Sequence, residues 1–595
     1  MTSLRSYIRR YLPNYLAGFF FLALTNALAL LIPMIFRIAV DSLTVLKKAH
    51  ELGLKPGPSD VSFLTNGVIA AVSLISLMMI FRIFSRVIIF NIGRHIEAEI
   101  RNDLFANLLR LDAAFYEEMP TGELMSRSVN DITNVRAMVG FSILNLMNTF
   151  TQGTLVIGQM IALSPLLTVY AVIPLPLLIV AVSRISRGLF KRSIEVQEGL
   201  AGLSSFVQED LTGLPTLQSY AREGGERARF ADSNEDYLTK NLKLAKIRSW
   251  VSGVMVAYGG IGSLVVLGLG GRAAIMGRLT IGELLAFGMY LTMLTWPTMA
   301  LGWLITVVQR GMASMKRVGE ILDRKPAVSV ADPAPISELK GEIEYDRLAF
   351  HYPKPSEKEP QRKPFSLGEI TERIDPGTRL AIVGPTGAGK SSLVKFLPRL
   401  LEAQNGSLKL DGVPVNRVPL DILRRDVGFV SQEPFLFSAT IHENVAMGNR
   451  NSSDADAQDS IRRAGLMPDL EEFPTGDRTI VGERGITLSG GQRQRVALAR
   501  TILGNPRILI LDDVFSSVDA QTEKNILAEL SIYMKGRTSI VITHRLSAIR
   551  DFDAILVIEN GRVVERGAHG ELMSRGGLYR RLVERQAIEE ELESL

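Results

Sequence analysis

The chain has 595 residues, which is too long for one ordinary domain, and 47% of them are hydrophobic while 22% are charged. Its positive mean hydropathy of +0.17 indicates that a very apolar part is averaged with a polar one. The net charge of +5 fits a nucleic acid or an anionic membrane face equally well. The absence of cysteine excludes disulfides, thiolate metal sites and a cysteine nucleophile.

Six largely apolar segments in the first half are long enough to cross a bilayer, which requires about 20 apolar residues. We expect membrane helices at roughly 15–40, 61–90, 137–163, 166–186, 249–271 and 281–309. Ser164-Pro165 predicts a turn between the third and fourth helices. A soluble core rarely contains six such segments, so the sequence predicts an all-α transmembrane domain over residues 1–325.

The N-terminal segment carries Arg5, Arg9 and Arg10 and is expected to form a short basic helix on the cytoplasmic face. The apolar segment that follows is longer than the hydrophobic core of a cleaved signal peptide. By the positive-inside rule the N-terminus is cytoplasmic, and six crossings return the chain to the cytoplasm. We therefore expect a multi-pass protein of the cell membrane, of the bacterial inner-membrane type, with its second half in the cytoplasm.

Two long charged connections, 91–136 and 184–248, are expected to extend the membrane helices into the cytoplasm. The helical pattern of each is broken, at EEMPTGEL (117–124) and at LTGLPTL (211–217). Such a break either presents a short helix to a cytoplasmic partner or forms an ordinary loop, and composition does not decide between the two.

Two faces inside the membrane domain are candidate contacts for a substrate. On the third helix, four amides fall within a sector of roughly 60° at about 100° per residue. They are Asn145, Asn148, Gln152 and Gln159. These amides either bond to neighbouring helices or line a cavity. On the sixth helix, Met293 and Trp296 share a face that suits an amphiphile, although plain packing or lipid contact is the favoured explanation.

A Pro- and Ala-rich linker at 326–340 precedes a second domain at 341–595, where strands alternate with helices as in an α/β fold. Its segment RLAIVGPTGAGKSS (379–392) predicts a strand, a phosphate-binding P-loop and a helix. Lys390 would reach the terminal phosphates and the Ser391 hydroxyl would bind Mg²⁺. The candidate nucleotide-binding residues of this segment are Gly384, Pro385, Thr386, Gly387, Ala388, Gly389, Lys390, Ser391 and Ser392.

A second motif, LSGGQ, opens a predicted helix within 486–503. It consists of Leu488, Ser489, Gly490, Gly491 and Gln492. The same half contains GFVSQEP with Gln432, an apolar strand ending at Asp512, SSVD with Asp519, and SIVITHRLS with His544. In this order the set closely resembles the ATP-binding domain of ABC transporters. The first half resembles the membrane domain of half-size ABC exporters of the multidrug and lipid-flippase type, so the resemblance covers nearly the whole chain.

The resemblance implies ATP and Mg²⁺ as cofactors and assigns residues to them. Tyr352 would stack on adenine, and His544 would contact the γ-phosphate. Gln432 would contact Mg²⁺ and sense the membrane domain, while Asp512 would hold the metal through water together with Ser391. Gln432 and His544 are thus candidate catalytic residues.

The resemblance also implies a dimer of half-transporters. LSGGQ would cap an ATP held by the other subunit's P-loop, Asp519 would belong to the D-loop, and 479–485 resembles the cross-talk loop that touches the membrane domain. Closure on two ATP molecules would turn a cavity from inward-facing to outward-facing. The expected function is ATP-driven export or flipping of an amphipathic drug, lipid or peptide.

Asp513 departs from the family pattern, in which a glutamate positions the attacking water. The aspartate carboxylate should stop about 1.5 Å short of that water. It is a candidate catalytic residue of a slow site, which favours a heterodimer with a better base in the partner and leaves a slow homodimer open. The charged segment 354–370 is also longer than the usual link to the P-loop.

Three rival functions are less compatible with these features. A soluble ABC ATPase acting on DNA or ribosomes conflicts with six membrane spans, so we expect no nucleic-acid partner. Importers of this superfamily usually keep membrane and ATP domains on separate chains. An ATP-gated channel or regulatory subunit with little hydrolysis remains the alternative because of Asp513.

Overall fold

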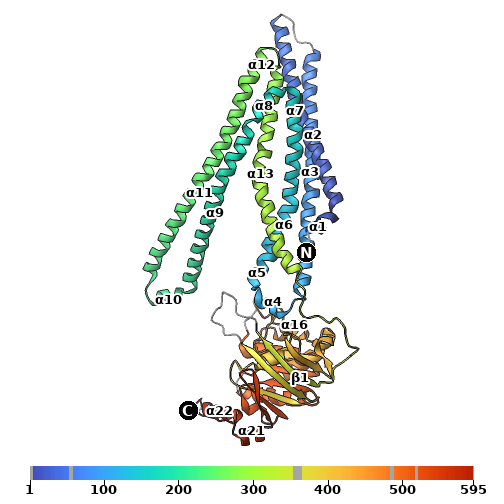
Figure 1. Ribbon diagram of the computed structural model, residues 1–595, viewed down its shortest axis with the longest axis vertical. Helices are drawn as coiled ribbons and strands as arrows, with labels where there is room; N and C mark the ends of the chain where they lie inside the picture. The colour runs from blue at the N-terminus through green and yellow to red at the C-terminus, as the bar shows by residue number, and fades with distance from the viewer. Residues whose placement is uncertain (1–3, 53–57, 353–364, 483–487, 516–519, 594–595) are drawn as a thin grey trace. The chain divides into compact units, whose positions relative to one another are not determined.

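The computed structural model describes residues 4–52, 58–352, 365–482, 488–515 and 520–593 (Figure 1). These residues form two compact units. The first comprises Met1–Leu109 and Thr121–Arg324, and the second comprises Arg110–Pro120 and Lys325–Leu595. The boundary near 324 agrees with the change in composition, but the short segment Arg110–Pro120 belongs to the second unit although the sequence places it in the membrane half.

The first unit is built from helices. Its long helices are α2 (Leu12–Glu51), α3 (Pro58–Leu108), α7 (Ile143–Leu163), α9 (Pro174–Thr212), α11 (Glu223–Val265) and α13 (Ile281–Leu322). Shorter elements are α1 (Leu4–Arg10), α5 (Thr121–Ser126), α6 (Ile132–Ala137), α8 (Pro165–Val172), α10 (Leu214–Ser219) and α12 (Gly271–Ile275). Three π-helical turns, η1 (Arg127–Asp131), η2 (Met138–Ser142) and η3 (Val266–Gly270), interrupt the helices. All six predicted membrane segments lie on these helices.

Two of the helices in the described ranges are long and apolar enough to cross a membrane by themselves, Leu12–Lys48 and Thr65–Leu108. The turn predicted at Ser164-Pro165 is confirmed: α7 ends at Leu163, and the Ser164 hydroxyl accepts a hydrogen bond from the Leu167 N–H at 3.4 Å at the start of α8. The predicted basic helix is α1, where Arg10 pairs with Glu99 of α3 at 2.7 Å.

Helix packing divides the first unit into two groups. Helix α2 packs along α3, α7 and α13, whereas α9 packs along α11, and α10 joins these two at their far ends (Figure 1). The α9–α11 pair contacts the other helices mainly through α8, η3 and α13.

At the start of α13, Asp41 of α2 accepts hydrogen bonds from the Thr280 hydroxyl at 2.8 Å and the Gly282 N–H at 2.9 Å. A carboxylate from α2 thus caps the first turn of α13.

The second unit is an α/β domain with two sheets. A six-stranded sheet has the order β10 (Arg562–Gly567), β9 (Ala554–Glu559), β3 (Arg379–Val383), β8 (Thr538–Ile542), β7 (Ile508–Asp512) and β6 (Val427–Val430). All its neighbours pair in parallel except β9 and β10. An antiparallel sheet has the order β2 (Ser366–Ile374), β1 (Ile343–His351), β4 (Asn405–Leu410) and β5 (Val413–Pro414).

Helices and short turns complete the second unit. They are α4 (Ala113–Glu118), α14 (Lys390–Lys395), α15 (Leu420–Asp426), α16 (Ile441–Ala446), α17 (Asp454–Arg463), α18 (Met467–Glu472), α19 (Gly490–Leu503), α20 (Ala520–Tyr533), α21 (His569–Arg575) and α22 (Leu578–Glu593), with η4 (Val415–Arg417), η5 (Gly476–Arg478) and η6 (Leu546–Ile549). The predicted linker lies against this unit, where the Ala334 N–H donates to the Arg417 carbonyl at 2.8 Å and Leu339 is buried.

The core of this unit explains where its site lies. Every residue of β7 and β8 is buried. Successive side chains of the central strands enter two different apolar clusters, as Leu509 and Leu511 enter one and Ile508 and Ile510 the other. The sheet is therefore covered on both faces, as parallel sheets usually are. Its polar groups gather where the parallel strands β3, β7 and β8 end, which is where α/β proteins bind ligands.

Candidate functional site

The P-loop connects β3 to α14. Gly384, Gly387 and Gly389 all have positive φ, at 149°, 79° and 101°. At Gly384 a Cβ atom would stand 2.0 Å from the Ile558 carbonyl oxygen, so only glycine fits there. The glycines of the motif therefore make both the conformation and the close approach of the loop to β9 possible.

Lys390 opens α14 and turns its side chain into the loop. Its Nζ donates to the carbonyl oxygens of Gly384 at 2.8 Å and Pro385 at 3.0 Å. Burial lowers the pKa of this ammonium, while the charges of Asp513 and Asp512 act in the opposite direction. A buried cation held by two neutral carbonyls is poised to exchange them for the stronger acceptors of a phosphate.

Asp512 ends β7 and meets the P-loop helix. Its Oδ1 accepts a hydrogen bond from the Ser391 hydroxyl at 2.9 Å, and the residue is 2% exposed. Burial raises the pKa of Asp512, against the opposing hydrogen bond from Ser391. A hydroxyl and a carboxylate in contact are ligands that suit Mg²⁺, which completes its shell with water and phosphate oxygens and needs no protein cage. These residues therefore fit the predicted metal.

Asp513 is buried and has an unusual backbone. Its φ is 51°, in the left-handed region that aspartate tolerates better than most residues. Its N–H donates to the Ile542 carbonyl at the end of β8 at 2.9 Å. The Gln432 side-chain amide lies 3.5 Å from the Asp513 Oδ2. The structure thus brings two of the predicted catalytic residues together.

His544 and Tyr352 flank this edge of the sheet. His544 follows β8 by two residues and is exposed. The Tyr352 hydroxyl lies 3.0 Å from the Ser392 hydroxyl of the P-loop, and its ring packs edge-on against Phe350 at 5.0 Å. Tyr352 therefore stands beside the P-loop, as an adenine-stacking residue requires.

LSGGQ begins α19 with a capping box. The Ser489 hydroxyl accepts from the Gln492 N–H at 3.2 Å, and the Gln492 Oε1 accepts from the Ser489 N–H at 2.9 Å. Leu488 is buried, while Ser489 is exposed. Asp519 and residues 483–485 of the predicted cross-talk loop at 479–485 lie outside the described residues.

The predicted cavity amides take part in bonds between helices. The Asn26 amide of α2 donates to the Asn148 oxygen at 3.1 Å, the Asn148 amide donates to the Gln152 oxygen at 3.3 Å, and the Gln152 amide donates to the Met293 carbonyl of α13 at 3.3 Å. Asn145 instead donates to a carbonyl of its preceding turn at 2.8 Å. The amides therefore connect α2, α7 and α13.

Two other candidate substrate contacts are placed less fully. Gln159 is exposed near the end of α7. The side chain of Trp296 lies outside the described side chains. A role for these residues and the amides in a substrate cavity stays a prediction.

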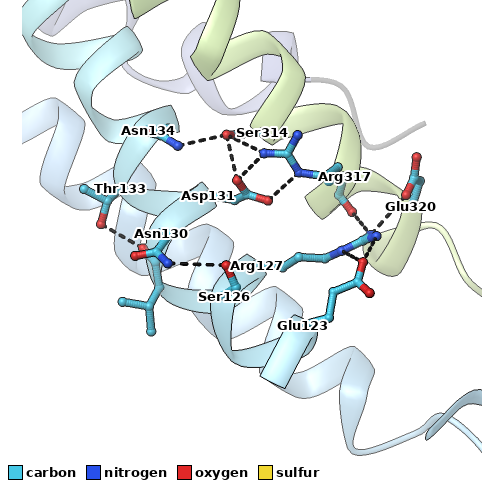
Figure 2. Close-up of polar contacts among 11 residues, drawn as sticks. Glu123, Ser126, Arg127, Asn130, Asp131, Thr133, Asn134, Ser314, Arg317 and Glu320 are labelled. Carbon is cyan, nitrogen blue, oxygen red and sulfur yellow. Dashed lines mark hydrogen bonds and ion pairs between the residues drawn. The ribbon is translucent and has the colours of Figure 1, made fainter. Parts of the chain in front are cut away.

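Sequence reasoning missed an ion-pair cluster that joins η1 and α6 to the last turns of α13 (Figure 2). Asp131 is 5% exposed and accepts hydrogen bonds from Ser314 at 2.8 Å and from two nitrogens of Arg317 at 2.8 and 2.5 Å. Arg127 donates to the Arg317 carbonyl at 2.9 Å and to Glu320 at 3.0 Å. Burial acts to raise the pKa of Asp131, but these bonds hold it below its usual value.

Arg317→Ala and Asp131→Ala should destabilise this cluster by different amounts. Arg317→Ala leaves a buried carboxylate without its main partner and should destabilise this region by about 1–3 kcal/mol. Asp131→Ala should cost less, because the Arg317 side chain is 45% exposed and can turn to water. The melting temperature of the full-length protein should fall more for Arg317→Ala, and the exposed pair control Arg229→Ala should leave it unchanged. Equal melting temperatures for all variants would contradict a structural role for the cluster.

A P-loop on a parallel sheet, a buried acidic pair beside it, and LSGGQ at a helix start define an ATP hydrolase, here fused to a domain of long apolar helices. The chain belongs to the ABC transporter family. The model of the ABC transporter transmembrane region matches residues 15–298, and the ABC transporter model matches residues 367–516. The family implies ATP hydrolysis coupled to transport.

Known relatives have the same two-part organisation. The chain is 38% identical to the probable multidrug resistance ABC transporter ATP-binding/permease protein YheI of Bacillus subtilis (strain 168), over 83% of each chain. It is 32% identical to the multidrug resistance-like ATP-binding protein MdlA of Escherichia coli (strain K12), over 99% of this chain and 96% of MdlA. The structure of a bacterial Atm1-family ABC exporter with ATP bound superposes with a TM-score of 0.79 at 26% identity, covering 97% of this chain and 99% of that one. The chain therefore has the half-size exporter fold, which points to a dimer in a membrane.

Proposed function

We propose that two half-transporters, at least one of them this chain, form an exporter that moves an amphipathic drug, lipid or peptide out of the cytoplasm by alternating access. The positions of two motifs carry the proposal. This chain's own ATP site, built from Lys390, Asp512 and Asp513, lies at the ends of the parallel strands, whereas LSGGQ lies at the start of α19. In the proposed dimer each LSGGQ completes the other subunit's ATP site.

The residues of the site have separate tasks in the proposed cycle. Lys390 would exchange the Gly384 and Pro385 carbonyls for ATP phosphates, and Ser391, Asp512 and Gln432 would hold Mg²⁺, which would neutralise charge on the phosphates when bound. Asp513 would act on the attacking water from about 1.5 Å too far away, and His544 would contact the γ-phosphate. The protein therefore contributes positioning and charge stabilisation rather than covalent chemistry.

Two cytoplasmic segments are proposed to pass domain closure to the membrane helices. The first break is preceded by α4, which belongs to the ATP-binding unit, where Phe115 is buried and the Asp112 carboxylate accepts from the Ala327 N–H at 3.5 Å. The second break contains Gly213 and is followed by α10. Both breaks therefore have a short helix beside them, which favours a docking element over a plain loop.

ATP-dependent flux tests the proposed function against its alternative. In proteoliposomes that contain the assembled transporter, a fluorescent amphiphile should move in the export direction only with hydrolysable ATP. Asp513 is the feature that favours an ATP-gated channel or regulatory subunit. That alternative predicts conductance on ATP addition, without uphill amphiphile transport, and this result would overturn the exporter proposal.

Gln152→Leu tests the membrane amides. It removes the bond to the Met293 carbonyl and the bond from the Asn148 amide, and such bonds contribute only about 0.6 kcal/mol each in membrane proteins, so the folded yield should change little. We expect altered substrate stimulation of the ATPase with unchanged ATP affinity, and the same for Gln159→Leu. The control Thr168→Val loses a bond to its own helix cap and should affect neither quantity. A lower yield with unchanged activity per folded molecule would show that these amides are only structural.

A further inference from the structure

The side chain of Gln494 joins two separate loops of the hydrolysis site. Gln494 lies on α19, two residues beyond LSGGQ, and is 4% exposed. Its amide nitrogen donates to the Gln432 carbonyl at 3.2 Å and to the Asp513 carbonyl at 3.3 Å. Both hydrogens of one amide group are thus directed at the backbones of two candidate catalytic residues.

The contact with Asp513 falls where the backbone needs support. The left-handed conformation costs an ordinary residue about 1–2 kcal/mol. Such conformations persist when the surrounding contacts over-determine them. Here the Ile542 carbonyl holds the Asp513 N–H and Gln494 holds the Asp513 carbonyl, so the peptide groups on both sides of the residue are held. Together these two bonds fix the backbone from which the Asp513 carboxylate projects.

The helix that carries Gln494 begins with the motif that would serve the other subunit's ATP. Ser489 caps α19, and Gln494 lies five residues further on, or about 7.5 Å along the axis at 1.5 Å per residue. A displacement of LSGGQ against a bound nucleotide would therefore move Gln494 as part of the same helix. Gln494 is placed to report that displacement to the residues that hydrolyse ATP on this chain's own P-loop.

We propose that Gln494 is a positioning residue that fixes Asp513 and Gln432 for hydrolysis and links the two ATP sites of the dimer through α19. The inference rests on the roles proposed above for Asp513 and Gln432.

Gln494→Met tests the inference, because methionine has a similar size and no donor. In the assembled transporter, single-turnover hydrolysis of radiolabelled ATP is measured for the wild type and for Asp513→Asn. The kinetic phase that Asp513→Asn slows belongs to this chain's own site. Gln494→Met should slow that phase at least about tenfold, since a 1 Å misplacement can cost about 10²-fold. The affinity for ATP should stay within about twofold, because the two hydrogen bonds described for the Gln494 amide go to Gln432 and Asp513 and not to the P-loop.

Two controls separate positioning from folding. Thr501→Val removes a hydrogen bond to the same helix and should leave the phase unchanged. In the Asp513→Asn background, Gln494→Met should cause a smaller further loss than in the wild type, because part of its effect passes through Asp513. If Gln494→Met does not fold, Gln494→Leu replaces it, since leucine also has no donor and introduces no charge into the buried position.

The possible results are distinct. An unchanged phase in Gln494→Met, an equal loss in both backgrounds, or a loss of ATP affinity parallel to the loss of rate would overturn the inference while the proposed function stands. If Asp513→Asn slows no phase, the proposed role of Asp513 fails and the inference fails with it.

Discussion

Asp513→Glu should speed ATP hydrolysis at this chain's own site by about 10- to 10²-fold. The longer side chain moves the carboxylate about 1.5 Å toward the attacking water, and a 1 Å error in position can cost about 10²-fold in rate. The backbone reduces the gain. At a φ of 51°, glutamate is less well tolerated than aspartate, and a penalty of about 1 kcal/mol would offset roughly fivefold of the gain.

Single-turnover hydrolysis of ATP by the assembled transporter measures this effect. Asp513→Asn provides the matched control, since it keeps the shape and removes the base, and it should slow the same phase. If Asp513→Glu leaves the rate unchanged or lowers it, the wild-type carboxylate already reaches its water, and the short side chain does not make the site slow.

Lys390→Ala should weaken ATP binding about 10- to 10²-fold and lower hydrolysis by a further 10² or so. A charged hydrogen bond contributes about 1.5–3 kcal/mol, which sets the loss of affinity. The loss of rate follows because the cation also stabilises charge on the phosphates during transfer. The Gly384 and Pro385 carbonyls would lose their donor in the empty loop, so some loss of order in the P-loop should accompany the change.

Binding of a fluorescent ATP analogue and steady-state phosphate release measure the two losses. Lys409→Ala, on β4 of the antiparallel sheet, is the control and should retain both activities, because Lys409 pairs with Glu344 at 2.9 Å. Near-normal hydrolysis by Lys390→Ala would contradict the assignment of the P-loop as the ATP site.

The sequence predicted the parts of the structure that depend on local order. The P-loop pattern implies glycines with positive φ, and Gly384, Gly387 and Gly389 have them. The apolar runs before Asp512 and His544 imply buried parallel strands whose ends meet, which explains why Asp512 contacts Ser391 although 121 positions separate them. Periodicity and motif order were therefore sufficient for the fold class, while the roles of the ATP-site residues stay predictions.

Other features depend on contacts between residues that are far apart in the chain, and these could not be predicted from one sequence. Asp131 and Arg317 are 186 positions apart, and each alone resembles an ordinary charged residue of a cytoplasmic helix. In the sequence, Gln494 cannot be distinguished from other polar residues of a helix. The structure shows that its side-chain amide bonds to two loops. The left-handed backbone of Asp513 also has no signal in the sequence except that aspartate tolerates it. The net charge of +5 did not distinguish a nucleic-acid partner from a membrane. The match to the ABC transporter transmembrane region indicated the membrane.

The steady-state ATPase rate of the purified wild-type chain, without any other half-transporter, tests the central claim most directly. The claim is that the chain binds ATP well on its own P-loop and hydrolyses it slowly because Asp513 stops short of the water. We expect saturable ATP binding with weak phosphate release, at least about tenfold below that of the Asp513→Glu chain measured in parallel. Vigorous hydrolysis by the wild-type chain alone, equal to or above that of the variant, would contradict the slow site and remove the case for a different partner chain.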